Sequence, residues 1–192
     1  MNKAIIILVL ILRIIITPFY YLAGGGAKTV EIGTKAQLGL TGIYMTVLSY
    51  KEIYPIREDK YYKKYIAFEV LLDGSKERTG SRFGSYVSWD SVDSYNTCGY
   101  FYLEGKIGRS KIRQLSLSPP EIVSLFGEDH PSVIGMGKMG EGKKVSGYVI
   151  FGLPEEFEAH KFIFLYDDHL EDVHQLLFPK TEIQVVLNNP IN

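Results

Sequence analysis

The stretch Lys64–Asp73, which reads KYIAFEVLLD, decides the fold of this chain. Its side chains alternate along an extended backbone, so that Ile66, Phe68, Val70 and Leu72 share one face. Aromatic and β-branched residues of this kind suit a pleated, half-buried surface. The stretch therefore predicts a β-strand that turns one face towards a hydrophobic core.

The same alternation recurs elsewhere in the chain. Turn-forming residues such as Asp73-Gly74-Ser75 separate the alternating runs. Several short strands separated by turn-forming residues predict an all-β fold, either an antiparallel sandwich or a barrel. The further runs are Gly42–Ile53, Val145–Leu153, Lys161–Tyr166 and Glu182–Leu187.

Two short helices are expected to interrupt the strands. Ser118-Pro119-Pro120-Glu121 resembles a capping box with proline at the first helical position, and Gly127 lies just past the expected end. A second helix is expected to begin at Asp167 or Asp168 and to end before Pro179. Its apolar stripe would consist of Leu170, Val173 and Leu177.

Composition narrows the class of protein. The 192 residues are 46% hydrophobic and 13% aromatic, which is enough to fill a core and too much for a disordered chain. The net charge is −1, without the basic excess of nucleic-acid binders, so no nucleic acid is expected as a partner. The single cysteine excludes an intrachain disulfide and a cysteine-rich zinc site.

The N-terminus has the pattern of a membrane-directing segment. Residues 4–12 are unbroken apolar sequence, and the apolar character continues beyond Arg13. About 20 such residues can cross the hydrocarbon of a bilayer. Arg13 at mid-span costs roughly 2.5–3.5 kcal/mol, which the surrounding Ile, Leu and Val residues can outweigh. Lys3 precedes the span, and the positive-inside rule then places the rest of the chain outside the cytoplasm.

Two fates of this segment stay open. It is either an uncleaved anchor or a secretory signal cut near Ala27, because Gly25 and Ala27 are small residues at the spacing that signal peptidase prefers. Gly24-Gly25-Gly26 predicts a flexible linker. The expected division is residues 1–27 as signal or anchor with the linker, and residues 28–192 as the β-sandwich domain.

Motifs for catalysis or nucleotide binding are weak. Residues 135–140, GMGKMG, match the dinucleotide pattern GxGxxG, but the following stretch has the pattern of a strand instead of the required helix. We therefore expect a turn between strands there, and no nucleotide. Cys98 has no evident base, no serine stands in GxSxG, and Asp90 and Asp93 beside Trp89 lack a fixed separation, so no catalytic residue is assigned.

An acidic region with His160, His169 and His174 is a candidate metal site. Imidazole and carboxylate groups both bind zinc. His169 and His174 are five residues apart, on different faces of a helix, and this favours a solvated acidic helix and loop. No metal and no cofactor is assigned. A metal-dependent or hydrolytic enzyme that uses the region His160–His174 is kept as an alternative function.

Two further surfaces could bind a ligand. Arg109, Lys111 and Arg113 would share one face of a strand, either contacting anionic groups or protecting a sheet edge from pairing. A group of tyrosines would form an exposed aromatic patch, or would line a cleft between the sheets of a small-ligand carrier, although sheet packing would absorb part of them. These are Tyr61, Tyr62, Tyr65, Tyr100 and Tyr102.

One stretch resembles a known family. Residues 141–154, EGKKVSGYVIFGLP, resemble the signature of telokin-like, immunoglobulin-like extracellular domains, which occur in prokaryotic lipoproteins and membrane-anchored proteins. Lys64–Val70, Trp89–Ser94 and Lys161–Asp167 resemble neighbouring segments of that family. The resemblance implies an immunoglobulin-like antiparallel β-sandwich with no established catalytic residues. The chain differs in lacking the lipid-bearing cysteine of many members and in its segments 105–139 and 169–192.

Together these observations predict an extracytoplasmic β-sandwich domain, membrane-anchored or secreted, that is not an enzyme. Its expected role is binding or scaffolding at the cell envelope. The expected contacts are the membrane, through residues 1–27, and another envelope protein or a surface polymer.

Overall fold

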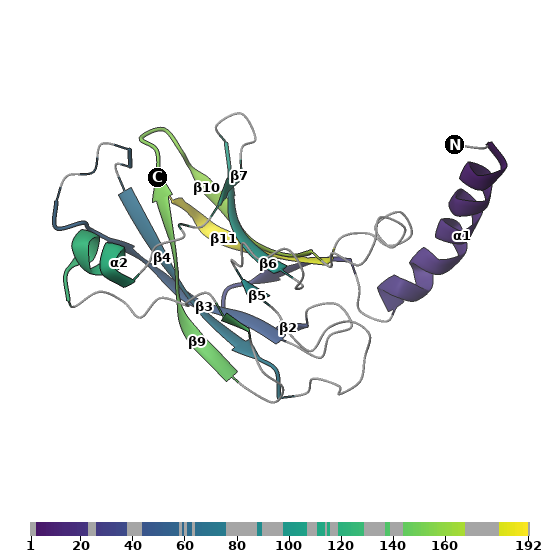
Figure 1. Cartoon of the computed structure of the whole chain (residues 1–192), viewed down its shortest axis with the longest axis horizontal. Helices are drawn as coiled ribbons and strands as arrows, with labels where there is room; N and C mark the ends of the chain where they lie inside the picture. Colours follow the sequence, from purple (N-terminus) through teal and green to yellow (C-terminus); the bar gives the residue numbers. More distant parts are fainter. Residues whose placement is uncertain are drawn as a thin grey trace.

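The structure of the chain is a computed structural model (Figure 1). It describes residues 3–22, 26–37, 44–57, 59, 61–62, 64–75, 88–89, 98–106, 111–113, 115, 119–128, 137–138, 144–167 and 181–191.

Two β-sheets form the body of the molecule (Figure 1). The smaller sheet has the strand order β2-β3-β4-β9, and the larger has the order β1-β11-β10-β6-β5-β8 with β7 paired to β6. The predicted all-β sandwich is therefore confirmed. The smaller sheet consists of β2 Ala36–Gln37, β3 Tyr44–Ile53, β4 Lys64–Asp73 and β9 Lys144–Leu153. The larger consists of β1 Ala27–Glu31, β5 Ser88–Trp89, β6 Cys98–Gly105, β7 Lys111–Arg113, β8 Gly137–Lys138, β10 Ala159–Asp167 and β11 Thr181–Ile191.

The alternating runs in the sequence fall on the long strands β3, β4, β9, β10 and β11. β4 lies between β3 and β9 and pairs antiparallel with both, with Phe68 opposite Tyr50 on one side and Val149 on the other. β9 begins at Lys144, one residue before the predicted run Val145–Leu153, and Gly147 lies inside it opposite Val70. Most pairings are antiparallel, but β1 runs parallel to β11 and β5 runs parallel to β6.

Phenylalanine rings fill the space between the sheets. Phe68 of the smaller sheet lies 4.8 Å, between ring centroids, from Phe162 of the larger, and 5.8 Å from Phe151. In the larger sheet Phe101 lies 4.5 Å from Phe164. All five side chains are fully buried. The predicted core-facing position of Phe68 is therefore confirmed, and Phe151, inside the predicted run Val145–Leu153, is buried as well. Packed phenylalanine lies between the sheets where the alternative of a small-ligand carrier places a tyrosine-lined cleft.

The first predicted short helix is confirmed as α2, Pro119–Phe126. Gly127 follows it with a φ of 80°, a left-handed conformation that favours glycine at a helix end, and its N–H donates to the carbonyl of Val123 at 2.8 Å. Ile122 and Phe126 form a second buried cluster with Tyr65 and Ala67, on the face of β4 opposite the main core. β4 is therefore covered on both faces at this end. The second predicted helix lies outside the described residues except for Asp167, which ends β10.

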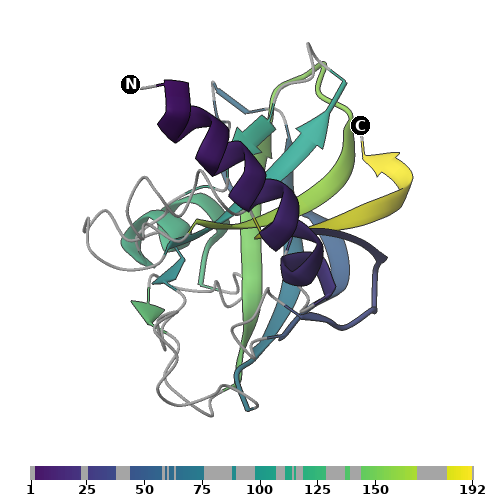
Figure 2. The same ribbon diagram turned by 90° about the vertical axis from the view of Figure 1, so that its right-hand side faces the viewer.

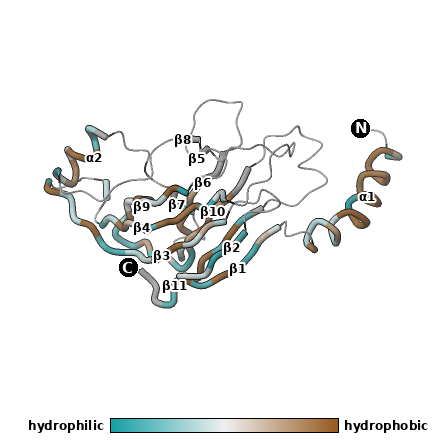
Figure 3. The backbone as a smooth tube through the Cα atoms, turned by 90° about the horizontal axis from the view of Figure 1, so that it is seen from below, coloured by the Kyte–Doolittle hydropathy of each residue, from teal (hydrophilic) through white to brown (hydrophobic). Residues whose placement is uncertain are grey.

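The N-terminal helix α1, Lys3–Leu22, stands outside both sheets (Figure 1 and, from the helix side, Figure 2). None of its residues is buried, and Pro18 lies inside it. It is mostly hydrophobic, with a few hydrophilic or neutral residues between the apolar ones (Figure 3), and it is long and apolar enough to cross a membrane. The predicted hydrophobic N-terminal helix is therefore confirmed.

Candidate interaction surface

One end of the sandwich is built from α2 and the connection between β3 and β4. The N–H of Ile56 in that connection donates to the carbonyl of Leu125 in α2 at 2.7 Å. This hydrogen bond fixes the connection beside the helix. α2 and α1 lie at opposite ends of the long axis of the molecule (Figure 1). We call the described residues of this connection, 54–57, 59, 61 and 62, together with α2 the distal end.

Asp59 organises the connection. One of its carboxylate oxygens, Oδ1, accepts hydrogen bonds from the backbone N–H of Tyr61 at 2.6 Å and of Tyr62 at 3.2 Å. The other, Oδ2, accepts from the hydroxyl of Tyr65 at 2.7 Å. Burial, followed by this hydrogen bond, raises the pKa of Tyr65 well above its usual value. The loop is thus anchored to β4 through a neutral, hydrogen-bonded phenol.

Aromatic side chains also pack the same connection against α2 and β9. Tyr65 meets Phe126 of α2 edge to face at 5.2 Å, and Tyr62 meets Tyr65 at 5.7 Å. The Tyr62 ring lies against Gly152 of β9 so closely that a Cβ added there would stand 2.5 Å from its Cγ. Glycine is therefore required at position 152 by the approach of an aromatic ring.

Large apolar side chains are exposed on this rigid base. Tyr54, Ile56 and Tyr61 are 73%, 62% and 69% exposed, and Val123 of α2 is 40% exposed. Exposed apolar side chains close together are typical of binding sites. The distal end exposes aromatic and aliphatic side chains on backbone that Asp59 and the Ile56–Leu125 hydrogen bond hold in place.

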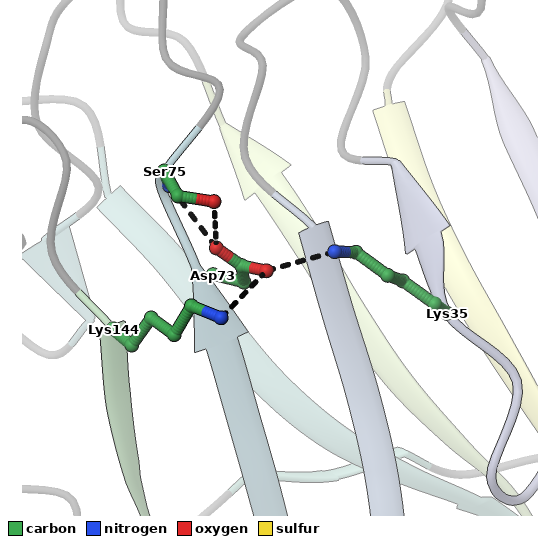
Figure 4. A network of polar contacts seen from close by, with 4 residues as sticks. All are labelled: Lys35, Asp73, Ser75 and Lys144. Atoms are coloured by element: carbon green, nitrogen blue, oxygen red, sulfur yellow. Dashed lines mark hydrogen bonds and ion pairs between the residues drawn. The ribbon is translucent and has the colours of Figure 1, made fainter.

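A second polar network lies at the end of β4 (Figure 4). Oδ2 of Asp73 lies 2.8 Å from the Nζ of Lys35 and 3.6 Å from that of Lys144. Oδ1 accepts from the N–H of Ser75 at 3.1 Å and from its hydroxyl at 2.5 Å. The hydrogen bond from Lys35, and then those from Ser75, hold the pKa of Asp73 far below its usual value.

Both oxygens of Asp73 are thus used within the protein. Lys35 also lies over the ring of Tyr44 in β3, 4.5 Å from the centroid. The network joins the segment before β2 to the C-terminal end of β4 and the N-terminal end of β9. It holds the Asp73-Gly74-Ser75 turn that the sequence predicts.

His160 is the described member of the candidate metal region. It lies at a β-bulge, since the pairing of β10 shifts register between Ala159 and Lys161. Its Nε2 lies 3.5 Å from Oε1 of Glu158 and has no hydrogen-bond partner among the residues that the structure describes. No group of three His, Cys, Asp or Glu side chains converges among the described residues. His169 and His174 lie outside them, so the alternative enzyme site has only one described histidine.

The predicted basic strand is β7, Lys111–Arg113, and Arg109 lies outside the described residues. Lys111 is paired with Glu104 of β6, Nζ to Oε2, at 3.8 Å. Oε1 of Glu104 lies 3.7 Å from the Nζ of Lys161. The charge of Lys111 is therefore met by an acidic neighbour, and β7 extends the sheet as a charged outer strand.

The structure describes only parts of the candidate nucleotide-binding and catalytic motifs. The sequence predicts a turn at the GxGxxG stretch. The structure corrects this at Gly137–Lys138, which forms the short strand β8 and pairs with Ser88–Trp89 of β5. Cys98 opens β6. The side chains of Cys98 and Trp89 lie outside the described part of the structure, as do the whole of Asp90 and Asp93.

The expected tyrosine patch is corrected at Tyr65, which is 1% exposed because α2 covers that face of β4. Tyr61 is exposed, whereas Tyr62 and Tyr102 are half-buried; the Tyr100 side chain is not described. Sequence reasoning missed Tyr54, Ile56 and the anchoring Asp59. The sequence Tyr54-Pro55-Ile56 could have indicated this surface, because it places large apolar residues on both sides of a proline in the connection between two strands.

Comparisons with known proteins found no family and two solved structures of low sequence identity. No protein-family model matches the chain, and no curated protein matches it. The crystal structure of the YjhA protein from Bacillus subtilis has a TM-score of 0.44 at 17% identity, covering 82% of this chain and 98% of that one. The secreted protein MPT63 from Mycobacterium tuberculosis has a TM-score of 0.46 at 10% identity, covering 84% and 98%. The functional conclusion therefore depends on this chain's own residues.

Proposed function

We propose that this chain is a cell-envelope protein, that α1 holds it in a membrane, and that its β-sandwich binds another envelope protein outside the cytoplasm without catalysis. α1 supports the anchoring. Its 20 residues give a length of about 30 Å, which matches the hydrocarbon thickness of a bilayer. Lys3 at its start supports the orientation by the positive-inside rule.

The start of β1 favours an uncleaved anchor over a secreted form. β1 begins at Ala27, which is opposite Glu182 of β11, and the carbonyl of Gly26 accepts from the N–H of Glu182 at 3.4 Å. A cut after Ala27 would remove the first residue of this strand and the preceding backbone hydrogen bond. The secreted form is the second candidate, and the mass of the mature chain distinguishes the two.

The observation that carries the binding role is the distal end. Tyr54, Ile56 and Tyr61 are exposed there on a loop held by Asp59, at the opposite end of the molecule from α1. Tyrosine is enriched in protein interfaces because it supplies a large amphipathic contact area at low cost in side-chain entropy. We therefore assign the distal end to a protein partner. A surface polymer is the competing occupant.

Site-specific crosslinking tests this role. A photo-reactive amino acid replaces Tyr61 in the full chain, in the native membrane, and the adducts are identified by mass spectrometry. We expect a discrete adduct with an envelope protein that Ile56→Ser abolishes. The matched control is Leu48→Ser, because Leu48 is also an exposed apolar residue but lies at the register shift of β3.

Loss of the adduct in both variants, or capture of polysaccharide instead of protein, would contradict the proposed surface. An equal yield from a photo-reactive residue placed at position 48 would show that collisions, not a binding site, produce the adduct.

A further inference from the structure

α1 carries polar groups in the middle of its apolar sequence. Arg13 is the only charged residue between Lys3 and Lys28. It is exposed on the helix, and no ion pair of Arg13 occurs among the residues that the structure describes. α1 contains no carboxylate that could neutralise it.

Arg13 cannot be placed at the membrane surface while α1 spans the bilayer. Nine helical residues precede it after Lys3, and nine follow it to Leu22. Each of these segments is about 14 Å long, half of the roughly 30 Å that must be crossed. Arg13 therefore lies near the bilayer centre, and its side chain is shorter than the distance to either surface.

Thr17 lies one turn after Arg13 on the same face of the helix. Its Oγ1 is buried against the surrounding chain and has no hydrogen-bond partner among the described residues. A threonine inside a helix commonly donates to the carbonyl four residues earlier, here that of Arg13, but Thr17 does not make this bond in the structure. The exposed Arg13 guanidinium is left to be satisfied from outside the helix, and the Thr17 hydroxyl lies beside it without a partner among the described residues.

We propose that Arg13 and Thr17 form a binding face for a second membrane-spanning helix that carries an Asp or Glu at the same depth. A carboxylate is an acceptor with two oxygens, so it can accept from the exposed guanidinium and, once the Thr17 side chain rotates outward, from the hydroxyl as well. A second copy of α1 does not fit, because it would bring another Arg13 and no acceptor side chain of opposite charge. This inference rests on the membrane anchoring proposed above.

A reporter of helix association in membranes tests it with the full chain. The probe is an oligo-leucine spanning helix with one central Asp, compared with the same helix carrying Leu or Lys there. We expect the Asp probe to associate roughly 5- to 30-fold more strongly than the Leu probe. Arg13→Leu removes this preference, Thr17→Val weakens it, and Arg13→Lys keeps part of it.

A matched variant tests the face as well as the charge. Arg13→Leu combined with Ile15→Arg moves the guanidinium about 3 Å along the axis and 200° around it, away from Thr17. We expect this variant to bind the Asp probe more weakly than the natural chain. Equal binding would overturn the shared face, and equal binding of Asp and Leu probes to the natural chain would overturn the proposal.

Crosslinking in the native membrane gives the second arm. A photo-reactive residue at position 16, beside the proposed face, should capture a protein whose span carries Asp or Glu near its middle, and Arg13→Leu should abolish the capture. Capture of a span without a carboxylate would contradict the proposal. Alkaline extraction separates the two claims: a chain released from the membrane refutes anchoring, whereas a retained chain without association refutes only the helix partner.

Discussion

Replacing Phe68 with Ala should cost a large part of the sandwich's stability. Phe68 has no exposed surface, and its ring lies between Tyr50 at 5.5 Å, Phe151 at 5.8 Å and Phe162 at 4.8 Å. These contacts join both sheets, so the cavity cannot close by the movement of one side chain. Removing a fully buried phenylalanine costs about 3–5 kcal/mol, within a total of about 5–15 kcal/mol for a typical domain.

The assay is urea unfolding of the full chain in detergent, followed by the far-ultraviolet circular dichroism of the strands. In a thermal melt of the same sample, a loss of about 3–5 kcal/mol lowers the melting temperature by about 6–20 °C for a domain of this length. Phe68→Leu should lose less, because part of the volume remains. Tyr61→Ala is the control at an exposed aromatic position and should change stability by less than about 0.5 kcal/mol. A loss below about 1 kcal/mol for Phe68→Ala would refute the assigned core.

Three further predictions test the polar network and the distal end. Gly152→Ala should cost about 1–3 kcal/mol in urea unfolding because the new methyl group meets the Tyr62 ring, and Tyr62→Ala should remove most of that cost in the double variant. Asp73→Asn should lower stability at neutral pH. The Asp73 carboxylate has a lowered pKa, so its contribution is present above about pH 4 and is lost as the pH falls further, and denaturation curves of variant and natural chain should converge in acid. Tyr65→Phe should speed amide hydrogen exchange at positions 61 and 62, because Asp59 loses its hydrogen bond from the Tyr65 hydroxyl. The ring packing with Phe126 is kept in this variant. Unchanged exchange would mean that the hydroxyl does not hold the loop.

The sequence predicts the long strands because their alternation is local information. Runs such as Lys64–Asp73 place apolar residues on one face whatever they pair with. β1, with the sequence AKTVE, has little alternating apolar character, and its parallel pairing with β11 joins segments far apart in the chain. β8 contains two residues of a glycine-rich stretch. Such strands form because a neighbouring strand offers hydrogen bonds, which no local pattern records.

The distal end was less predictable for a related reason. Tyr65 alternates with the core-facing residues of β4, and from the sequence this predicts an exposed ring. α2 covers that face, which is information about tertiary packing. Nothing in the local sequence distinguishes Asp59 from an ordinary loop residue. Its role depends on the Tyr65 hydroxyl, which the fold places 2.7 Å from its Oδ2. The exposure of Tyr54 and Ile56 likewise follows from which neighbours the fold leaves uncovered.

The central claim is that an intact α1 holds the sandwich outside the cytoplasm, and protease treatment of intact cells or spheroplasts tests it most directly. The account predicts that an added protease digests the sandwich, that a fragment containing α1 stays in the membrane after alkaline extraction, and that the untreated chain has its full-length mass. Complete protection of the sandwich until the cells are lysed would contradict the orientation. A mature chain that begins near Ala27 would contradict the anchor.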